Sequence, residues 1–385
     1  MSRRLSIAVC LFVSLSCGKS SPSEPTDNNP TPPAVAAAPT LDAPAADVQL
    51  ATLRPTLQVK NGTSAQTGAK TYEFQISDRA DFAPSTGSAY YLVTLTRAGV
   101  VEGATTSAFA VVQDLQPATR FYWRARWLQG ATAGDWSQTF TFRTQIVGFN
   151  RAGELYDPLV NGETIAEARV GASTFVDGKG LRLTDTNQHL RYRLVQPIWT
   201  GEFSLDVEGL SANPVSPSGA STGKLKILSM DDDPVNHYTS DWLMNAQYRG
   251  FDGNPDHAIS FKMLLGEEVD ARKLEPDIGR RQASVRQLNP GHTYYWKATW
   301  ANFIQLLVQD GGVGGVNGTG SGQGGATIYD YGQSSVFSYQ PSLHFAYVGV
   351  NNSAVDTGSW PATYRNVWIG SKTRPATLGS ALWPR

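Results

Sequence analysis

Residues 121–127 read FYWRARW, and this short segment decides the fold class. Phe121, Trp123, Ala125 and Trp127 alternate with polar or charged residues, and a period of two places all four on one face of a β-strand. Similar alternation flanks this segment at residues 53–59, 72–76, 91–95 and 140–142. Short strands at this spacing, separated by turn signals, predict a sandwich of two antiparallel sheets.

Residues 115–144 resemble the fibronectin type III family. The matching residues form a Leu-x-Pro turn, a Tyr-x-Trp-Arg strand and a closing Trp-Ser…Phe-x-Thr strand: Leu115, Pro117, Thr119, Tyr122, Trp123, Arg124, Ala125, Arg126, Trp136, Ser137, Phe140, Phe142 and Thr144. Phe121 can also take the family's Tyr position, so the register stays open by one residue. The resemblance implies a binding or spacing module over residues 46–146, without catalysis. Because Trp123 and Trp127 share a strand face, we expect them in the core.

The composition argues against nucleic-acid binding and favours all-β domains. The chain has 385 residues, with 32 Lys and Arg against 33 Asp and Glu, and a net charge of −1. That balance lacks the basic excess of a general nucleic-acid binder, so we expect no nucleic-acid partner. Charged residues make up only 17%, whereas 37 Gly and 22 Pro favour turn-rich all-β domains. The length predicts two domains.

The N-terminus predicts export. Residues 1–17 combine a basic start with a short apolar run, which is typical of a signal peptide. Ser16, Cys17 and Gly18 resemble a bacterial lipobox, although Ser14 stands where Leu is usual. The resemblance implies that Cys17 is acylated, and an ordinary secretion signal is the alternative. Cys10 lies in the signal as well, so the mature body contains no disulfide.

A linker follows the signal over residues 18–45, where Pro, Ser, Ala and Asn dominate. It predicts a spacer that holds the folded part away from the membrane. We therefore expect a lipid-anchored protein of the bacterial cell envelope, at the outer membrane or cell surface, with membrane contact only through the N-terminal lipid.

Residues 147–385 continue the β pattern at larger scale. Strands are predicted at 181–195, 202–210, 224–230, 257–265, 293–300, 303–309, 343–350 and 364–370. So many antiparallel strands in one domain indicate two curved sheets. The domain resembles the concanavalin A-like lectin/glucanase (jelly-roll) fold in three segments, which are 153–183, 343–350 (LHFAYVGV) and 357–372. The resemblance implies a domain that binds, hydrolyses or eliminates extracellular polysaccharide.

One predicted strand carries an unusual polar row. The segment NQHLRYRL places four polar residues on one face, Asn187, His189, Arg191 and Arg193. Such a face suits an anionic glycan, and these are the predicted ligand-binding residues. A polysaccharide lyase also needs a carboxylate neutraliser and a Tyr or His near the C5 proton. Tyr295 and Lys297, on the polar side of another strand, would complete a catalytic set with His189 and Arg191.

A simpler interpretation competes with this site. Antiparallel pairing of the next two strands would place Arg193 and His189 near Glu202 and Asp206, as a solvated charge ladder. The sequence favours this ladder over a glycan site. Residues 187–194 are therefore a candidate site, and the pairing of their strand decides between a glycan site and a charge ladder.

Glycoside hydrolysis needs two carboxylates across a sugar. Glucanases of this fold carry them on one strand as Glu-x-Asp-x-(x)-Glu. Here Asp206 and Glu208 share a face, but Ser204 replaces the first Glu and Glu202 lies one step too far back. The motif is broken, which argues against hydrolysis.

Calcium is the only cofactor for which the sequence offers candidates. Asp231 and Asp233 lie in the acidic segment MDDDP, but the spacing lacks an EF-hand pattern and a solvated turn is the simpler interpretation. Three functions stay open: a glycan-binding module without catalysis, a polysaccharide lyase or hydrolase, and a structural surface protein with a protein partner. Whether the chain is an enzyme, and its oligomeric state, are not decided by the sequence.

Overall fold

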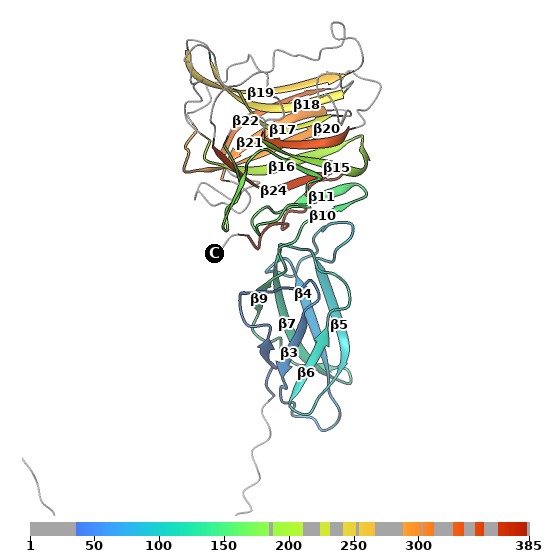
Figure 1. The fold of residues 1–385 in the computed structure, drawn as a ribbon. Helices are drawn as coiled ribbons and strands as arrows, with labels where there is room; N and C mark the ends of the chain where they lie inside the picture. The colour runs from blue at the N-terminus through green and yellow to red at the C-terminus, as the bar shows by residue number, and fades with distance from the viewer. Residues whose placement is uncertain are drawn as a thin grey trace, which may run out of the picture.

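The computed structural model describes residues 36–184, 188–210, 224–231, 242–251, 254–265, 288–301, 303–311, 326–334, 343–349 and 361–382. Within these ranges every regular element is a β-strand, which confirms the all-β fold class. The strands build two sandwiches stacked end to end, with the smaller N-terminal one below in Figure 1. The same ranges contain no helix with the length and apolar character needed to cross a membrane.

The smaller sandwich contains β1 (Thr40–Ala43), β2 (Val48–Gln49), β3 (Thr56–Lys60), β4 (Thr71–Ser77), β5 (Thr94–Val101), β6 (Thr106–Ala110), β7 (Arg120–Gln129), β8 (Thr132–Ala133) and β9 (Phe140–Arg143). One sheet has the order β1-β3-β6, and the other has the order β2-β9-β7-β4-β5, with β8 beside β7. Strand β1 lies inside the predicted linker 18–45 and pairs with β3. The sandwich therefore begins earlier than the predicted boundary at residue 46.

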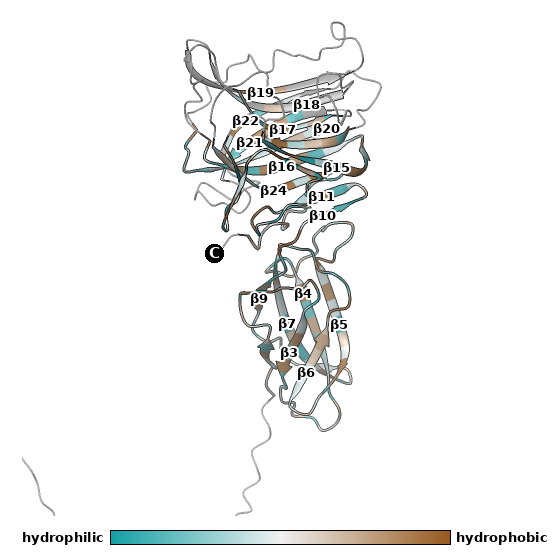
Figure 2. Ribbon diagram, in the orientation of Figure 1, coloured by the Kyte–Doolittle hydropathy of each residue, from teal (hydrophilic) through white to brown (hydrophobic). Residues whose placement is uncertain are grey.

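The core of this sandwich follows the alternation of β7. Phe121, Trp123 and Ala125 are fully buried, and Trp127 is nearly so, which confirms that both Trp side chains are core residues. Tyr122 is only half-buried on the opposite face. Phe121, and not Tyr122, therefore takes the inward position. Figure 2 shows apolar and polar residues alternating along the strands.

The larger sandwich contains β10 (Phe149–Arg151), β11 (Glu154–Asp157), β12 (Ala168–Val170), β13 (Thr174–Val176), β14 (Gly180–Leu183), β15 (His189–Ile198), β16 (Gly201–Glu208), β17 (Lys224–Asp231), β18 (Trp242–Phe251), β19 (Asn254–Leu265), β20 (Thr293–Trp300), β21 (Phe303–Asp310), β22 (Ala326–Ser334), β23 (Leu343–Gly349) and β24 (Ala362–Gly370). One sheet, here called the β16 sheet, has the order β10-β11-β24-β16-β20-β21-β22, with β14 beside β24 and β13 beside β14. The other, here called the β15 sheet, has the order β12-β15-β23-β17-β18-β19.

The predicted strand over residues 181–195 is in fact two strands of different sheets. Its first part is β14, which pairs with β24 in the β16 sheet. Its second part is β15, which pairs with β12 and β23 in the β15 sheet. Within the described ranges, six strands of the larger sandwich were not predicted: β10, β11, β12, β13, β18 and β22. The core lies between the two sheets, where Leu190 and Tyr192 of β15 pack in one cluster with Phe203 and Leu205 of β16.

A carboxyl group lies buried between the two sheets. Asp157 of β11 is 1% exposed, and its Oδ2 accepts hydrogen bonds from Thr164 Oγ1 at 2.6 Å, Tyr192 Oη at 3.0 Å and the Ile165 amide at 3.1 Å. Burial raises the pKa of Asp157 to about 6, although these hydrogen bonds favour the ionised form. Because Tyr192 belongs to β15, this carboxyl group connects the two sheets through their interior.

The two sandwiches share an aromatic junction. Its buried residues come from both bodies: Tyr91, Ala118, Phe149, Tyr156, Trp368 and Leu378. The C-terminal segment 371–382 reaches back to the smaller sandwich, where Ala381 N donates to Ala118 O at 3.0 Å and Thr377 Oγ1 donates to Asp78 Oδ2 at 2.6 Å. The last described residues of the chain therefore fasten the larger sandwich to the smaller one.

Candidate functional site

The outer face of β15 carries a row of cationic and polar side chains. Leu190 and Tyr192 point into the core, so period-two geometry turns His189, Arg191 and Arg193 to the other side. The row becomes more exposed along the strand. His189 is 9% exposed, whereas the side chains of Arg191 and Arg193 are 30% and 61% exposed. The structure thus brings three of the four predicted ligand-binding residues together, and the fourth, Asn187, lies outside the described residues.

Aromatic rings of the neighbouring strand β23 border this row. The antiparallel register places Tyr347 opposite Arg191 and Phe345 opposite Arg193. The His189 and Tyr347 rings meet edge-on with centroids 5.8 Å apart, and the Arg193 guanidinium lies 5.4 Å from the centre of the Phe345 ring. The second contact places the Arg193 guanidinium against an aromatic ring, and the first packs His189 edge-on against Tyr347.

Gly349 lies opposite His189 and lets the two strands approach at the end of the row. Its φ is +95°, and a Cβ there would lie 2.6 Å from the carbonyl oxygen of Gln188. No larger residue fits this position without moving the backbone. The glycine therefore fixes the backbone beside His189.

The next strand, β17, adds buried polar groups to the same face. Ser229 lies opposite Tyr347, and Asp231 lies opposite Phe345. The Tyr347 hydroxyl donates a hydrogen bond to Asp231 Oδ1 at 3.2 Å, and Ser229 and Asp231 are fully buried. Of the two calcium candidates, Asp231 is thus a hydrogen-bond partner of Tyr347, and Asp233 lies outside the described residues. Among the described residues, no three His, Cys, Asp or Glu side chains gather as a metal site.

Glu167 places a negative charge beside both arginines. Its Oε2 lies 3.5 Å from Arg191 Nε, and its Oε1 lies 3.4 Å from Arg193 Nε. Glu167 immediately precedes β12, which pairs with β15 at the edge of the sheet. The cationic row therefore lies between an edge carboxylate on one side and aromatic rings on the other.

The predicted charge ladder is wrong. It required β15 to pair with β16, but these strands belong to different sheets. Glu202 and Asp206 of β16 face the outside of the β16 sheet, beyond the core from His189 and Arg193. The carboxylates predicted for the ladder are thereby excluded, and the two arginines face Glu167 instead.

Tyr295 and Lys297 do not join the His189 row. Both belong to β20, which pairs with β16, and they lie on the outside of the β16 sheet with Glu202 and Asp206. Tyr295 is 1% exposed, and burial raises the pKa of its phenol well above the ordinary value. The predicted catalytic set is therefore wrong for Tyr295 and Lys297, which lie on a different sheet from His189 and Arg191.

The broken carboxylate motif is closed to a sugar. Asp206 is fully buried and accepts a hydrogen bond from Asn366 Nδ2 at 3.2 Å. Glu202 is 4% exposed and accepts one from the Arg374 amide at 2.9 Å, while burial raises its pKa. Since Arg374 belongs to the C-terminal segment that docks on this face, these two carboxylates serve intramolecular packing.

Sequence reasoning missed Tyr347, Phe345 and Glu167. The first two alternate with the core residues Ala346 and Val348, so their outward direction was readable in LHFAYVGV. Their place beside Arg191 and Arg193 depends on the register between strands that are far apart in the chain. No local pattern carries that register.

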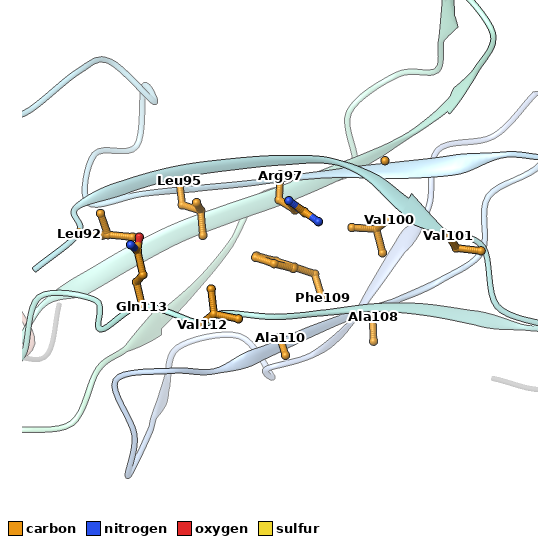
Figure 3. A pocket seen from close by; sticks show the side chains of 11 residues that line it. Leu92, Leu95, Arg97, Val100, Val101, Ala108, Phe109, Ala110, Val112 and Gln113 are labelled. Atoms are coloured by element: carbon orange, nitrogen blue, oxygen red, sulfur yellow. The ribbon is translucent and has the colours of Figure 1, made fainter.

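The smaller sandwich has a hollow of a different kind. It lies between the edge strands β5 and β6, has a volume of about 510 Å³, and is lined mainly by apolar side chains. Figure 3 shows Leu95 and Arg97 side by side on one side of it and Phe109 on the other. Arg97 is the charged residue of this lining, so the hollow offers a hydrophilic glycan few polar groups.

Comparisons with known proteins give no family. No protein-family model and no curated protein sequence matches the chain. Among solved structures, an alginate lyase in complex with an alginate tetrasaccharide is 11% identical, with a TM-score of 0.37, over 58% of this chain and 98% of that one. A Trypanosoma rangeli sialidase in complex with sialic acid is 10% identical, with a TM-score of 0.32, over 68% of this chain and 42% of that one. The receptor-binding domain of botulinum neurotoxin type G gives a TM-score of 0.34 at 10% identity, over 60% of this chain and 51% of that one. Likenesses this weak carry no argument about function.

Proposed function

We propose that the larger sandwich binds an anionic, uronate-bearing polysaccharide on the outer face of the β15 sheet. One observation carries the proposal: Arg191 and Arg193 point from the same face of β15 and lie beside the rings of Tyr347 and Phe345. Guanidinium groups bind carboxylates through charge-assisted hydrogen bonds. The rings of Tyr347 and Phe345 are themselves buried, at 5% and 6% exposed, so they support the arginines from beneath and the guanidinium groups make the contact with the ligand.

The charge arrangement also favours an anionic glycan over a neutral one. Arg191, Arg193 and Lys226 are positively charged residues of the described part of this face, against Glu167 and Asp231. The excess is small, but it is concentrated along β15. A polymer with regularly spaced carboxylates can contact the half-buried Arg191 and the exposed Arg193, whereas a neutral polymer brings no charge to either.

Binding can be measured by calorimetry with three uronate-bearing polymers, here called polyuronates for short (alginate, polygalacturonate and hyaluronan), and with dextran as the neutral control. Arg191→Ala removes a charge-assisted contact and should cost about 1.5–3 kcal/mol, or roughly tenfold to a hundredfold in affinity. Arg182→Ala is the matched control, because Arg182 is exposed on β14 of the other sheet. Equal binding by both variants, or no preference for polyuronates over dextran, would refute the proposal.

A lyase activity is the second candidate, and the contact between His189 and Tyr347 favours it. In such a β-elimination a base removes the C5 proton, and Arg191 neutralises the uronate carboxylate that stabilises the resulting charge. The C4–O bond then breaks, its oxygen takes a proton, and a C4=C5 double bond remains. We infer that His189 and Tyr347 exchange these two protons; they lie at the buried end of the row, at 9% and 5% exposed, and the Tyr347 hydroxyl is hydrogen-bonded to Asp231.

The two candidates separate experimentally. A lyase produces unsaturated uronates, which absorb ultraviolet light as they accumulate. His189→Ala and Tyr347→Phe should abolish this signal while calorimetric binding persists. Unchanged product formation in both variants would exclude this pair as the proton-transfer groups, and absence of product in the native protein would leave a binding module.

The proposed setting is the bacterial cell envelope. Export and acylation of Cys17 are supported by the N-terminal sequence, whose residues lie outside the described ranges. With the lipid at the N-terminus, the smaller sandwich would act as a spacer that presents the larger one to extracellular glycan.

A further inference from the structure

Glu167 faces both guanidinium groups at once. Its two carboxylate oxygens point to different arginines, with Oε2 near Arg191 and Oε1 near Arg193. Under the proposed function, a ligand carboxylate would need this same position between the two side chains. The protein's own carboxylate therefore lies where the ligand's carboxylate would bind.

We propose that Glu167 is a resident anion that a ligand must displace, and that it restricts the site to polyanionic glycans. This inference rests on the proposed function. Its first support is the looseness of the contact. The N–O distances of 3.5 and 3.4 Å exceed the length of about 2.7–2.9 Å that is typical of charge-assisted hydrogen bonds. Glu167 is therefore paired with the two arginines by charge, and neither of these two contacts is a short hydrogen bond.

The second support is the difference in anchoring between the partners. Glu167 precedes the three-residue edge strand β12, and its side chain is 35% exposed, so it can turn into water. Arg191 belongs to β15, which is paired on both sides by β12 and β23. Displacement would thus move the carboxylate and leave the cationic row in place.

The selectivity follows from competition between anions. A neutral sugar gains no ionic contact by displacing Glu167, so the resident pair opposes its binding. A single carboxylate only exchanges one anion for another. A polymer with a carboxylate on each sugar replaces Glu167 and keeps further carboxylates nearby, which raises their effective concentration at the site. Glu167 is therefore a specificity-determining residue.

The alternative is that Glu167 helps binding by orienting the arginines. The two roles predict opposite signs. If Glu167 competes with the ligand, Glu167→Gln should bind polyuronate about threefold to tenfold more tightly than the native protein. The reason is that the ligand no longer has to break a surface ion pair in order to bind. If Glu167 orients the arginines, the same change should weaken binding.

The experiment compares the native protein, Glu167→Gln and Glu163→Gln by calorimetry with the tightest-binding polyuronate and with dextran. Glu163→Gln is the matched control, because Glu163 is exposed four residues earlier and its substitution changes the net charge equally. The affinity of this variant for polyuronate should stay within about twofold of the native value. Glu167→Asp keeps the charge but retracts it by one methylene, and it should give an intermediate gain. Thermal melts of all variants check that the fold is retained.

The outcomes distinguish the two proposals. A gain for Glu167→Gln that exceeds the gain for Glu163→Gln supports the resident anion. Equal or weaker binding by Glu167→Gln, while the native protein binds and Arg191→Ala does not, overturns this inference alone. Failure of the native protein to bind any of the three polyuronates overturns the proposed function and this inference with it.

Discussion

Replacing Asp157 by Asn should change how the stability of the protein depends on pH. The buried carboxyl group accepts three hydrogen bonds between the two sheets, yet burial raises its pKa to about 6 from 3.8. In the folded state the proton is therefore held more tightly than in the unfolded chain. A raised carboxyl pKa means that ionisation opposes folding, so this group's contribution to stability falls as the pH rises from about 4 to about 6 and levels off above it.

The size of the effect follows from the shift. A difference of about two pKa units corresponds to about 3 kcal/mol between the two protonation states. The Asn side chain cannot ionise, so Asp157→Asn removes this pH-dependent part. Its hydrogen bonds to Thr164 and Ile165 can persist through the amide oxygen, and any loss there is the same at every pH. The difference in free energy of unfolding between variant and native protein should therefore move by about 2–3 kcal/mol in favour of the variant between about pH 4 and about pH 7.

Urea denaturation followed by tryptophan fluorescence at several pH values measures this difference. Asp177→Asn is the matched control, because Asp177 is exposed on the β13–β14 hairpin and its substitution also removes one negative charge. The control should show no comparable change with pH. A constant difference between Asp157→Asn and the native protein across the whole pH range would refute the account of the buried carboxyl group.

Three further predictions test other parts of the structure. A fragment of residues 36–146 should melt cooperatively, whereas residues 46–146 should be less stable by about 1.5–3 kcal/mol or more, because β1 and its buried Leu41 are lost; equal melting of both fragments would contradict the place of β1. Tyr295→Phe should leave polyuronate binding and any product formation unchanged, since Tyr295 lies on the other sheet; a loss of either would restore it to the site. Mass spectrometry of the native protein should find a diacyl or triacyl Cys17 as the mature N-terminus, and a free N-terminus elsewhere in residues 18–30 would exclude the lipid anchor.

The sequence predicted which side chains share one face of a strand, but it did not predict which sheet the strand joins. Alternation placed His189, Arg191 and Arg193 on one face because the side-chain period of a strand is two. The same alternation continued through residues 181–195 without marking that β14 and β15 belong to different sheets. The predicted pairing of β15 with β16 failed for this reason, although the two strands are adjacent in the chain.

The partners of the polar row could not be predicted from local patterns. Tyr295 and Tyr347 both point outward from aromatic strands, and nothing in either segment says which one lies beside Arg191. The register of β15 with β23 decides it, and register is set by long-range packing of both sheets. The burial of Glu202 and Asp206 likewise depends on the C-terminal segment, whose docking is a contact between distant parts of the chain.

A crystal structure of the protein with a bound uronate tetrasaccharide tests the central claim most directly. We expect a sugar carboxylate between the guanidinium groups of Arg191 and Arg193, and the Glu167 side chain turned away from both arginines. An oligosaccharide bound on the outer face of the β16 sheet or in the hollow between β5 and β6, with the Glu167 pairs intact, would contradict it.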